Sequence, residues 1–170
     1  MQALYLPLVR YWLARFPGLG KEIDDLVQDV LVVLVHELPS FERRRHGAFR
    51  AWLRQITINR VRTWWRTQLK QPQAQLGEES EQLLSQLEDP NSDLSRQWDQ
   101  QHDRHVLQRL LAAVKADFEP CPWQAFTRIA LDGLSLAEAA RELQLSESAV
   151  AQAKFRVLKR LREEAGDFLS

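Results

Sequence analysis

Two short helices with serines at their starts, separated by a tight turn, constrain the fold of this chain most strongly. Ser135 precedes the amphipathic segment 136–143, and Glu138 stands three residues after the serine, which is the spacing of a capping box. Ser146 then caps a second helix after a three-residue turn. Small residues occupy the positions where the two helices would cross: Ala139, Ala140 and Ala153. This arrangement predicts a helix-turn-helix.

Helical spacing of apolar residues continues through most of the chain and predicts an all-α fold. We expect helices over about 4–16, 22–38, 48–68, 92–118 and 123–131, in addition to the pair above. A stretch rich in Gln, Glu, Pro and Gly interrupts the pattern after Lys70 and predicts a flexible acidic linker with at most a weak helical turn. The expected organisation is two small helical domains, 1–70 and 92–170, joined by the linker 71–91.

The charges are divided into blocks, although the formal net charge is zero. Residues 42–70 carry nine basic residues and one acid, whereas residues 71–105 carry two basic residues and eight acids. Three tryptophans, Trp52, Trp64 and Trp65, stand within the basic block. Basic residues interleaved with aromatic rings suit nucleic acid that has unpaired bases to stack upon.

A helical wheel divides residues 48–68 into two arcs. The arc expected in the core contains Phe49, Trp52, Leu53, Ile56 and Trp64. The opposite arc, expected to face solvent and nucleic acid, contains Arg50, Arg54, Arg62, Trp65 and Arg66, with Asn59 at its margin. The loop before this helix adds Arg43, Arg44, Arg45 and His46. On this interpretation Trp65 points outward among arginines; the alternative is that it packs on a neighbouring helix.

The second helix of the helix-turn-helix is the candidate recognition helix, whose first residues would face base edges in a major groove. Candidates for base contacts are Ser146, Glu147, Ser148 and Gln152, because amide and carboxylate side chains can pair with adenine and cytosine. The basic residues that follow, Lys154, Arg156 and Lys159, suit phosphates. Gln144 stands in the turn, and a left-handed backbone there would cost about 1–2 kcal/mol.

Several classes of protein are disfavoured. The single cysteine, Cys121, excludes an internal disulfide, the longest apolar run is too short to span a bilayer, and the first residues do not resemble a signal peptide. These features favour a reducing cytoplasm. Residues that could hold a metal share one helix, but two histidines without a stronger cluster are more often packing residues: Asp99, His102, Asp103 and His105. We expect no metal, no cofactor and no enzymatic activity.

The segments 24–38 (DDLVQDVLVVLVHEL) and 40–66 (SF…GAFRAWLRQITINRVRTWWR) resemble region 2 of bacterial RNA polymerase sigma factors. The segment 130–164 (ALDGLSLAEAARELQLSESAVAQAKFRVLKRLREE) is similar to their region 4. The two occur in the same order as in the small extracytoplasmic-function (ECF) group. This sequence differs from the family pattern of region 4 at Gln144, where glycine is usual, and at Ala151 and Ala153, where many relatives carry basic residues.

The resemblance implies a division of labour. The second helix would bind the clamp helices of the polymerase β′ subunit through Asp25, Gln28 and Asp29. The basic loop and the following helix would recognise the minus-ten element and hold its strands open, and the linker would run toward the polymerase active centre. Region 4 would sit on the β flap and read the minus-thirty-five element, and an anti-sigma protein is a possible further partner.

Two rival interpretations remain at the level of sequence. A two-domain transcriptional regulator that never binds core polymerase would share the helix-turn-helix, but it leaves the acidic residues of the second helix without a role. A metal-dependent hydrolase would need a catalytic motif that the sequence lacks.

Overall fold

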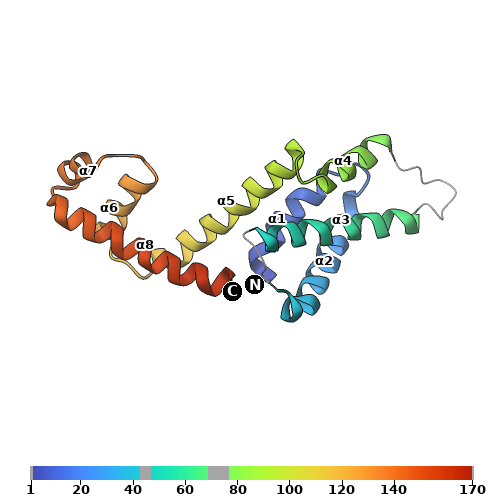
Figure 1. Cartoon of the computed structure of the whole chain (residues 1–170), viewed down its shortest axis with the longest axis horizontal. Helices are drawn as coiled ribbons and strands as arrows, with labels where there is room; N and C mark the ends of the chain where they lie inside the picture. Colours follow the sequence, from blue (N-terminus) through green and yellow to red (C-terminus); the bar gives the residue numbers. More distant parts are fainter. Residues whose placement is uncertain (1, 43–46, 69–76, 170) are drawn as a thin grey trace. The chain divides into compact units, whose positions relative to one another are not determined.

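The computed structural model describes residues 2–42, 47–68 and 77–169, and within these ranges every regular element is a helix (Figure 1). The chain divides into two compact units, residues 1–105 and 106–170. The all-α fold expected from the sequence is therefore confirmed. Because the first unit continues to His105, the boundary between the units lies further along the chain than expected.

Three helices form the core of the first unit: α1 (Gln2–Leu13), α2 (Ile23–Glu37) and α3 (Ala48–Gln68). Short 3-10 turns, Gly20–Glu22 and Leu38–Ser40, precede and follow α2. Helix α2 packs against both α1 and α3. The apolar stripes read from the sequence supply the buried residues, among them Val9, Trp12, Leu26, Val30, Leu34, Leu53 and Val61.

The described part of the expected linker, residues 77–91, is mostly helical and belongs to the first unit. Helix α4 (Glu78–Glu88) packs on α3, and α5 (Asp93–Lys115) contributes its first part to this unit and its remainder to the second. Leu84, Leu87 and Trp98 have at most 1% of their surface exposed. Apolar burial outweighs the polar composition that favoured a linker, because Leu84 and Leu87 lie on the same face of α4.

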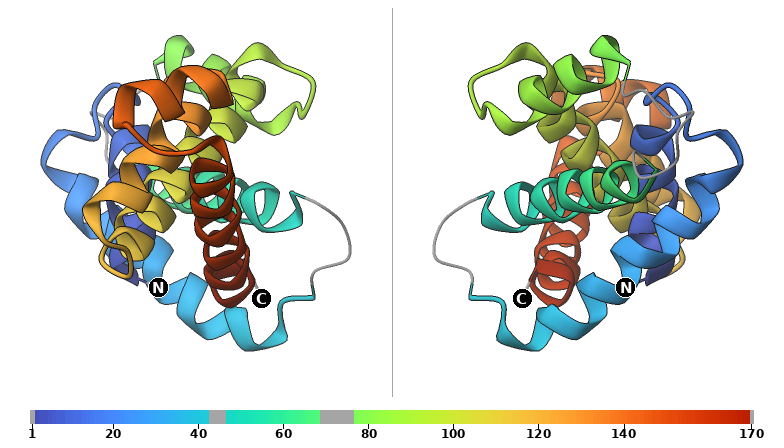
Figure 2. Two further views of the ribbon diagram at one scale, coloured as in Figure 1. Left: turned by 90° about the vertical axis from the view of Figure 1, so that its left-hand side faces the viewer. Right: turned by 90° about the vertical axis from the view of Figure 1, so that its right-hand side faces the viewer.

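Side-chain hydrogen bonds fix the turn between α4 and α5. Ser92 Oγ accepts a hydrogen bond from the backbone N–H of Ser95 at 3.0 Å, which caps the start of α5. The hydroxyl of Ser95 in turn donates to the carbonyl of Leu87 at 3.0 Å. Figure 2 shows α4 and the start of α5 joined by this short turn. The two helices therefore form one supported unit rather than a loose chain.

The second unit contains the expected helix-turn-helix. Helices α6 (Pro120–Ala130) and α7 (Leu136–Leu143) both pack on α8 (Glu147–Leu169). The residues buried where the helices cross are small: Ala125, Ala139, Ala140, Val150 and Ala153. Alanines at these positions let the helix axes approach closely, as the sequence predicted.

The local signals of the helix-turn-helix are also confirmed. Ser135 and Glu138 form a reciprocal capping box at the start of α7, and Ser146 Oγ accepts from the N–H of Ala149 at 3.1 Å. Gln144 ends α7 in the left-handed region, with φ 55° and ψ 42°. It is the one residue other than glycine with positive φ in the described part of the chain.

The strain at Gln144 yields a test. Replacement of Gln144 by Gly should raise the free energy of unfolding by up to about 1 kcal/mol, because glycine adopts the left-handed backbone without the clash of a Cβ atom and loses part of that gain to chain entropy. Thermal and chemical denaturation followed by far-UV circular dichroism measure this. Gln144→Ala, which keeps the Cβ atom, is the control. A Gly variant less stable than wild type would contradict the role assigned to this turn.

Candidate nucleic-acid interface

Helix α2 presents one face to the core and a different face to solvent. Its buried stripe is Leu26, Val27, Val30, Leu31 and Leu34. Asp25, Gln28 and Asp29 are exposed, as expected from the sequence. Val32 and Val35, which the sequence analysis did not single out, continue the exposed row and are 54% and 46% exposed. Exposed valines beside acids on one helical face are typical of a protein-binding surface.

Helix α3 is buried over a much wider arc than the wheel predicted. Trp65, expected to point outward, is 7% exposed, and its ring lies edge-on to Phe16 at 5.9 Å between centroids. Arg54, also expected on the outward arc, is 8% exposed. Both placements were wrong. Trp52 and Trp64, assigned to the core, are half-buried.

Arg54 is buried because α3 has neighbours on a second side, whereas the ring of Trp65 is covered by Phe16. The wheel assumed that one face packs on α1 and α2 while the opposite face meets water. In the structure α4 and the first part of α5 also lie against α3, and the indole N–H of Trp98 donates to the carbonyl of Arg50 at 3.1 Å. A helix with neighbours on two sides buries a broad arc, and its period alone does not reveal the second neighbour.

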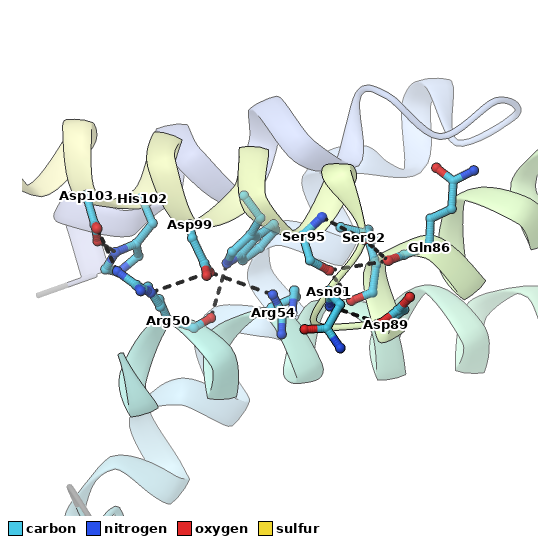
Figure 3. A network of polar contacts seen from close by, with 12 residues as sticks. Arg50, Arg54, Gln86, Asp89, Asn91, Ser92, Ser95, Asp99, His102 and Asp103 are labelled. Carbon is cyan, nitrogen blue, oxygen red and sulfur yellow. Dashed lines mark hydrogen bonds and ion pairs between the residues drawn. The ribbon is translucent and has the colours of Figure 1, made fainter. Parts of the chain in front are cut away.

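Carboxylates of α5 face Arg50 and Arg54 of α3 (Figure 3), and a carboxylate of α4 faces Arg62. Arg50 Nη1 lies 2.6 Å from Asp103 Oδ2, and its Nε lies 3.5 Å from Asp99 Oδ1. Arg54 Nη1 lies 3.7 Å from the same Asp99 oxygen. Arg62 makes a two-pronged pair with Glu88, with Nη2 2.6 Å from Oε2. Three acids of the acidic block, Glu88, Asp99 and Asp103, are therefore paired with arginines of the basic block.

Other predicted minus-ten residues are more accessible. Asn59 is exposed and accepts a hydrogen bond from Gln55 at 3.0 Å, and Arg66 is exposed. The residues of the basic loop, Arg43, Arg44, Arg45 and His46, lie outside the described residues. The structure thus brings Asn59 and Arg66 to the surface of α3, while it pairs Arg50 and Arg62 and buries Arg54 and Trp65.

A hollow beside two stacked aromatic rings, one of them just before Arg43 in the sequence, was missed by sequence reasoning. Phe41 and Trp52 stack with ring centroids 4.6 Å apart and planes inclined by 23°. They line a hollow of ≈ 380 Å³ together with Glu37, Ser40 and Glu42. The signal was present in the sequence as Phe41, two residues before a run of arginines, but its stacking partner could not be identified from spacing.

The residues weighed as a metal site have other partners. His102 is 4% exposed, stacks on Tyr5 and lies 3.2 Å from Asp103 through its Nδ1, while its Nε2 has no hydrogen-bond partner among the described residues. Burial lowers the pKa of His102 below its ordinary value of 6.5, although the Asp103 carboxylate acts in the opposite direction. No group of three or more His, Cys, Asp or Glu residues that could hold a metal occurs in the described ranges.

Helix α8 presents a basic surface with an aromatic side chain at its centre. Ser146, Glu147, Ser148, Gln152, Arg156 and Lys159 are exposed, as expected for a recognition helix. Lys154 is half-buried and lies about 140° around the helix from Lys159, so it does not share that face. Phe155, which the sequence analysis missed, is 63% exposed beside Gln152 and Lys159. Its signal was an aromatic residue outside the apolar stripe of the helix.

Comparison with protein families also divides the chain into an N-terminal and a C-terminal part. The Sigma-70 region 2 family model matches residues 1–71, and the Sigma-70, region 4 model matches residues 124–161. The chain belongs to the sigma-70 family. The pairing of these two regions is the architecture typical of ECF sigma factors. No curated protein matches the chain.

Membership of this family defines the activity at a general level. A sigma factor recognises promoters and initiates transcription with core RNA polymerase, and the family is not enzymatic. The region 2 match ends at residue 71, so α4 and the first part of α5 are additions to the packing of that region. In the described part of this sigma factor, no helix is long and apolar enough to cross a membrane.

The buried imidazole predicts a dependence of stability on pH. His102 is held neutral when folded and is protonated more readily when unfolded, so the unfolded state binds more protons below about pH 6.5. The free energy of unfolding should therefore fall as the pH drops from 6.5 toward the lowered folded pKa, by at most about 1.4 kcal/mol per pH unit. Urea unfolding between pH 7.5 and 5.5 measures the slope.

Removal of the imidazole supplies the control. His102→Gln should lose this part of the pH dependence, whereas His36→Gln, at an exposed position of α2, should keep it. An equal slope in wild type and His102→Gln would contradict the assignment.

Proposed function

We propose that the exposed face of α2 binds the clamp helices of the polymerase β′ subunit. The observation that carries this proposal is the continuous row of Asp25, Gln28, Asp29 and Val32 on a helix whose other face is core. The apolar side chains supply area to bury, and the carboxylates supply charge complementarity to a basic partner. This row has no role in the rival interpretation, a regulator that does not bind polymerase.

The hollow beside Phe41 and Trp52 is the proposed site of base capture in the minus-ten element. Stacked aromatic rings offer a surface for an unpaired base, worth about 1–3 kcal/mol per base. The carboxylates of Glu37 and Glu42 can accept hydrogen bonds from the amino group of adenine or cytosine. The basic loop Arg43–His46 would hold the DNA backbone next to the captured base. Asn59 and Arg66 would contact the same strand, as would Arg50 and Arg62 once they are free of their carboxylates.

Helix α8 is proposed to read the minus-thirty-five element from the major groove. Gln152 suits adenine, the exposed ring of Phe155 suits the methyl group of thymine, and Lys159 and Arg156 suit phosphates. Glu147, Ser146 and Ser148 lie at the first turn of the helix, where base contacts of this fold concentrate. Lys154 is a phosphate contact from the flank of the helix.

Promoter opening should depend on the polymerase. Separating base-pair steps costs about 1.4 kcal/mol each, and one or two captured bases return about 1–3 kcal/mol apiece. The free chain should therefore bind promoter DNA weakly and leave it closed. We place its action in the cytoplasm, where transcription occurs, with region 4 on the β flap and an anti-sigma protein as a possible regulator.

Neutralisation of α2 tests the polymerase contact. Asp29→Asn should weaken binding to core RNA polymerase by about tenfold, equivalent to about 1.4 kcal/mol, because a charge at the interface is lost without a change of shape. Glu79→Gln, an equal loss of charge at an exposed position of α4, should bind like wild type. Fluorescence titration of labelled sigma factor with core enzyme measures both. Wild-type affinity in Asp29→Asn, Gln28→Ala and Asp25→Asn alike would contradict the proposed face.

Base substitution tests the aromatic contact of α8. The promoter is first selected from a library with core polymerase, and each thymine of its minus-thirty-five element is then replaced by uracil, which lacks only the methyl group. Wild type should lose affinity at one position, by about tenfold at most, and Phe155→Ala should not distinguish the two bases there. Lys159→Ala is the control: it should weaken binding to both bases equally and reduce the salt dependence by about one phosphate contact. A wild-type protein indifferent to every such replacement would remove Phe155 from the reading surface.

A further inference from the structure

Three arginines of α3, Arg50, Arg54 and Arg62, are paired with carboxylates of the chain itself, and the proposed function turns two of them, Arg50 and Arg62, toward DNA. The acids come from the segment 78–105, named here the α4–α5 cover, which lies outside the matched region 2. Glu88 faces Arg62 from α4, and Asp103 faces Arg50 from α5. A carboxylate and a phosphate offer an arginine the same pair of oxygen acceptors, so each pair occupies a position that a DNA phosphate could take.

The three pairs differ in accessibility, and this difference separates their roles. The Arg54 side chain is 10% exposed, so its contact with Asp99 is part of the packing. Arg62 and Glu88 are 28% and 36% exposed, and Arg50 and Asp103 are 22% and 58% exposed. A phosphate can reach the Arg62–Glu88 and Arg50–Asp103 pairs from solvent. Exposed ion pairs contribute only about 0.2–1 kcal/mol, so these two can be exchanged without unfolding the cover.

The cover itself is held by apolar contacts. Leu84, Leu87 and Trp98 are fully buried, and Ser95 bonds to the carbonyl of Leu87. The acids are therefore presented at fixed positions on folded helices and not by a loose acidic chain. Hydrogen bonds from Arg62 lower the pKa of Glu88, which keeps this carboxylate charged at neutral pH.

We propose that Glu88 and Asp103 act as internal substitutes for DNA phosphates, which hold Arg62 and Arg50 in the free sigma factor and give way when a DNA strand occupies region 2. The cover thereby reduces binding of the free protein to DNA outside the polymerase complex. This inference rests on the proposed use of α3 in minus-ten binding. It gives the acidic block of the sequence a function in region 2 itself.

Direct titration of the full-length protein tests the inference. The probe is a fluorescein-labelled 20-nucleotide single strand of mixed sequence, and the variants are Glu88→Gln and Asp103→Asn, alone and together. The matched control is Asp93→Asn, which removes the same charge from α5 at a residue that is 90% exposed and paired with Arg96 of its own helix. Each test variant should bind about two- to fivefold more tightly than the control.

The salt dependence distinguishes a released arginine from a general change in charge. Each arginine that becomes free to contact a phosphate should steepen the slope of log affinity against log salt by about 0.7 on a single strand. In an Arg62→Ala background, Glu88→Gln should give no gain beyond that of the control, because the two residues act as a pair. Test variants that bind like Asp93→Asn, or more weakly, would overturn the inference.

Two further arms keep the result interpretable. Should Glu88→Gln lose its helical circular dichroism, Glu88→Asp replaces it. Aspartate keeps the charge but holds it one methylene group further from Arg62. Its affinity for the single strand should lie between those of wild type and the double variant. An affinity equal to that of wild type overturns the inference. Transcription with core polymerase is measured in parallel. Absence of initiation by every protein, wild type included, would contradict the proposed function, whereas normal initiation without a gain in DNA binding would contradict only the internal substitution.

Discussion

The packing of the α4–α5 cover on α3 is the constraint on which the rest of region 2 depends. Burial of a side chain such as Trp98 is worth about 3–5 kcal/mol, whereas each exposed ion pair between the cover and α3 is worth about 0.2–1 kcal/mol. The apolar contacts therefore decide where the cover lies, and the ion pairs adjust which arginines are available. This ordering of energies lets one segment be firmly folded and still exchange its surface contacts with a ligand. Acids of the cover compensate part of the charge of this basic helix, at Arg50, Arg54 and Arg62.

The parts of the structure that the sequence predicted are those set by local chemistry. The capping box at Ser135, the cap at Ser146 and the alanines at the helix crossing are all read within a few residues of one another, so the helix-turn-helix followed without knowledge of the rest of the fold. The exposed face of α2 was predicted for the same reason, since a single apolar stripe leaves its remaining positions to solvent. At Gln144 the sequence indicated only the cost that a left-handed backbone would carry, and the structure shows that the residue adopts it.

The errors lie where a segment distant in sequence supplies the neighbour. The wheel placed Arg54 and Trp65 in solvent because nothing within α3 indicates that Asp99 of α5 lies against Arg54 or that Phe16 packs on the ring of Trp65. The composition of 71–91 favoured a linker, and the leucines of α4 were too few to outweigh it until their burial against α3 was seen. Phe155 was missed for the opposite reason: an exposed aromatic residue breaks the apolar pattern, and the pattern was used to define what mattered. The proposed DNA surface consequently moves away from Trp65 and toward the hollow beside Trp52, the open residues of α3 and the face of α8.

Hydrogen exchange of the free sigma factor tests the central claim most directly. If the cover is an integral part of region 2, amides of α4 and of the first part of α5 should exchange about as slowly as those of α3, since burial of Leu84, Leu87 and Trp98 must be undone for any of them to open. Exchange in 78–100 at the rate of an unstructured chain, with α3 still protected, would contradict the account, because the arginines of α3 would then have no fixed acids to hold them.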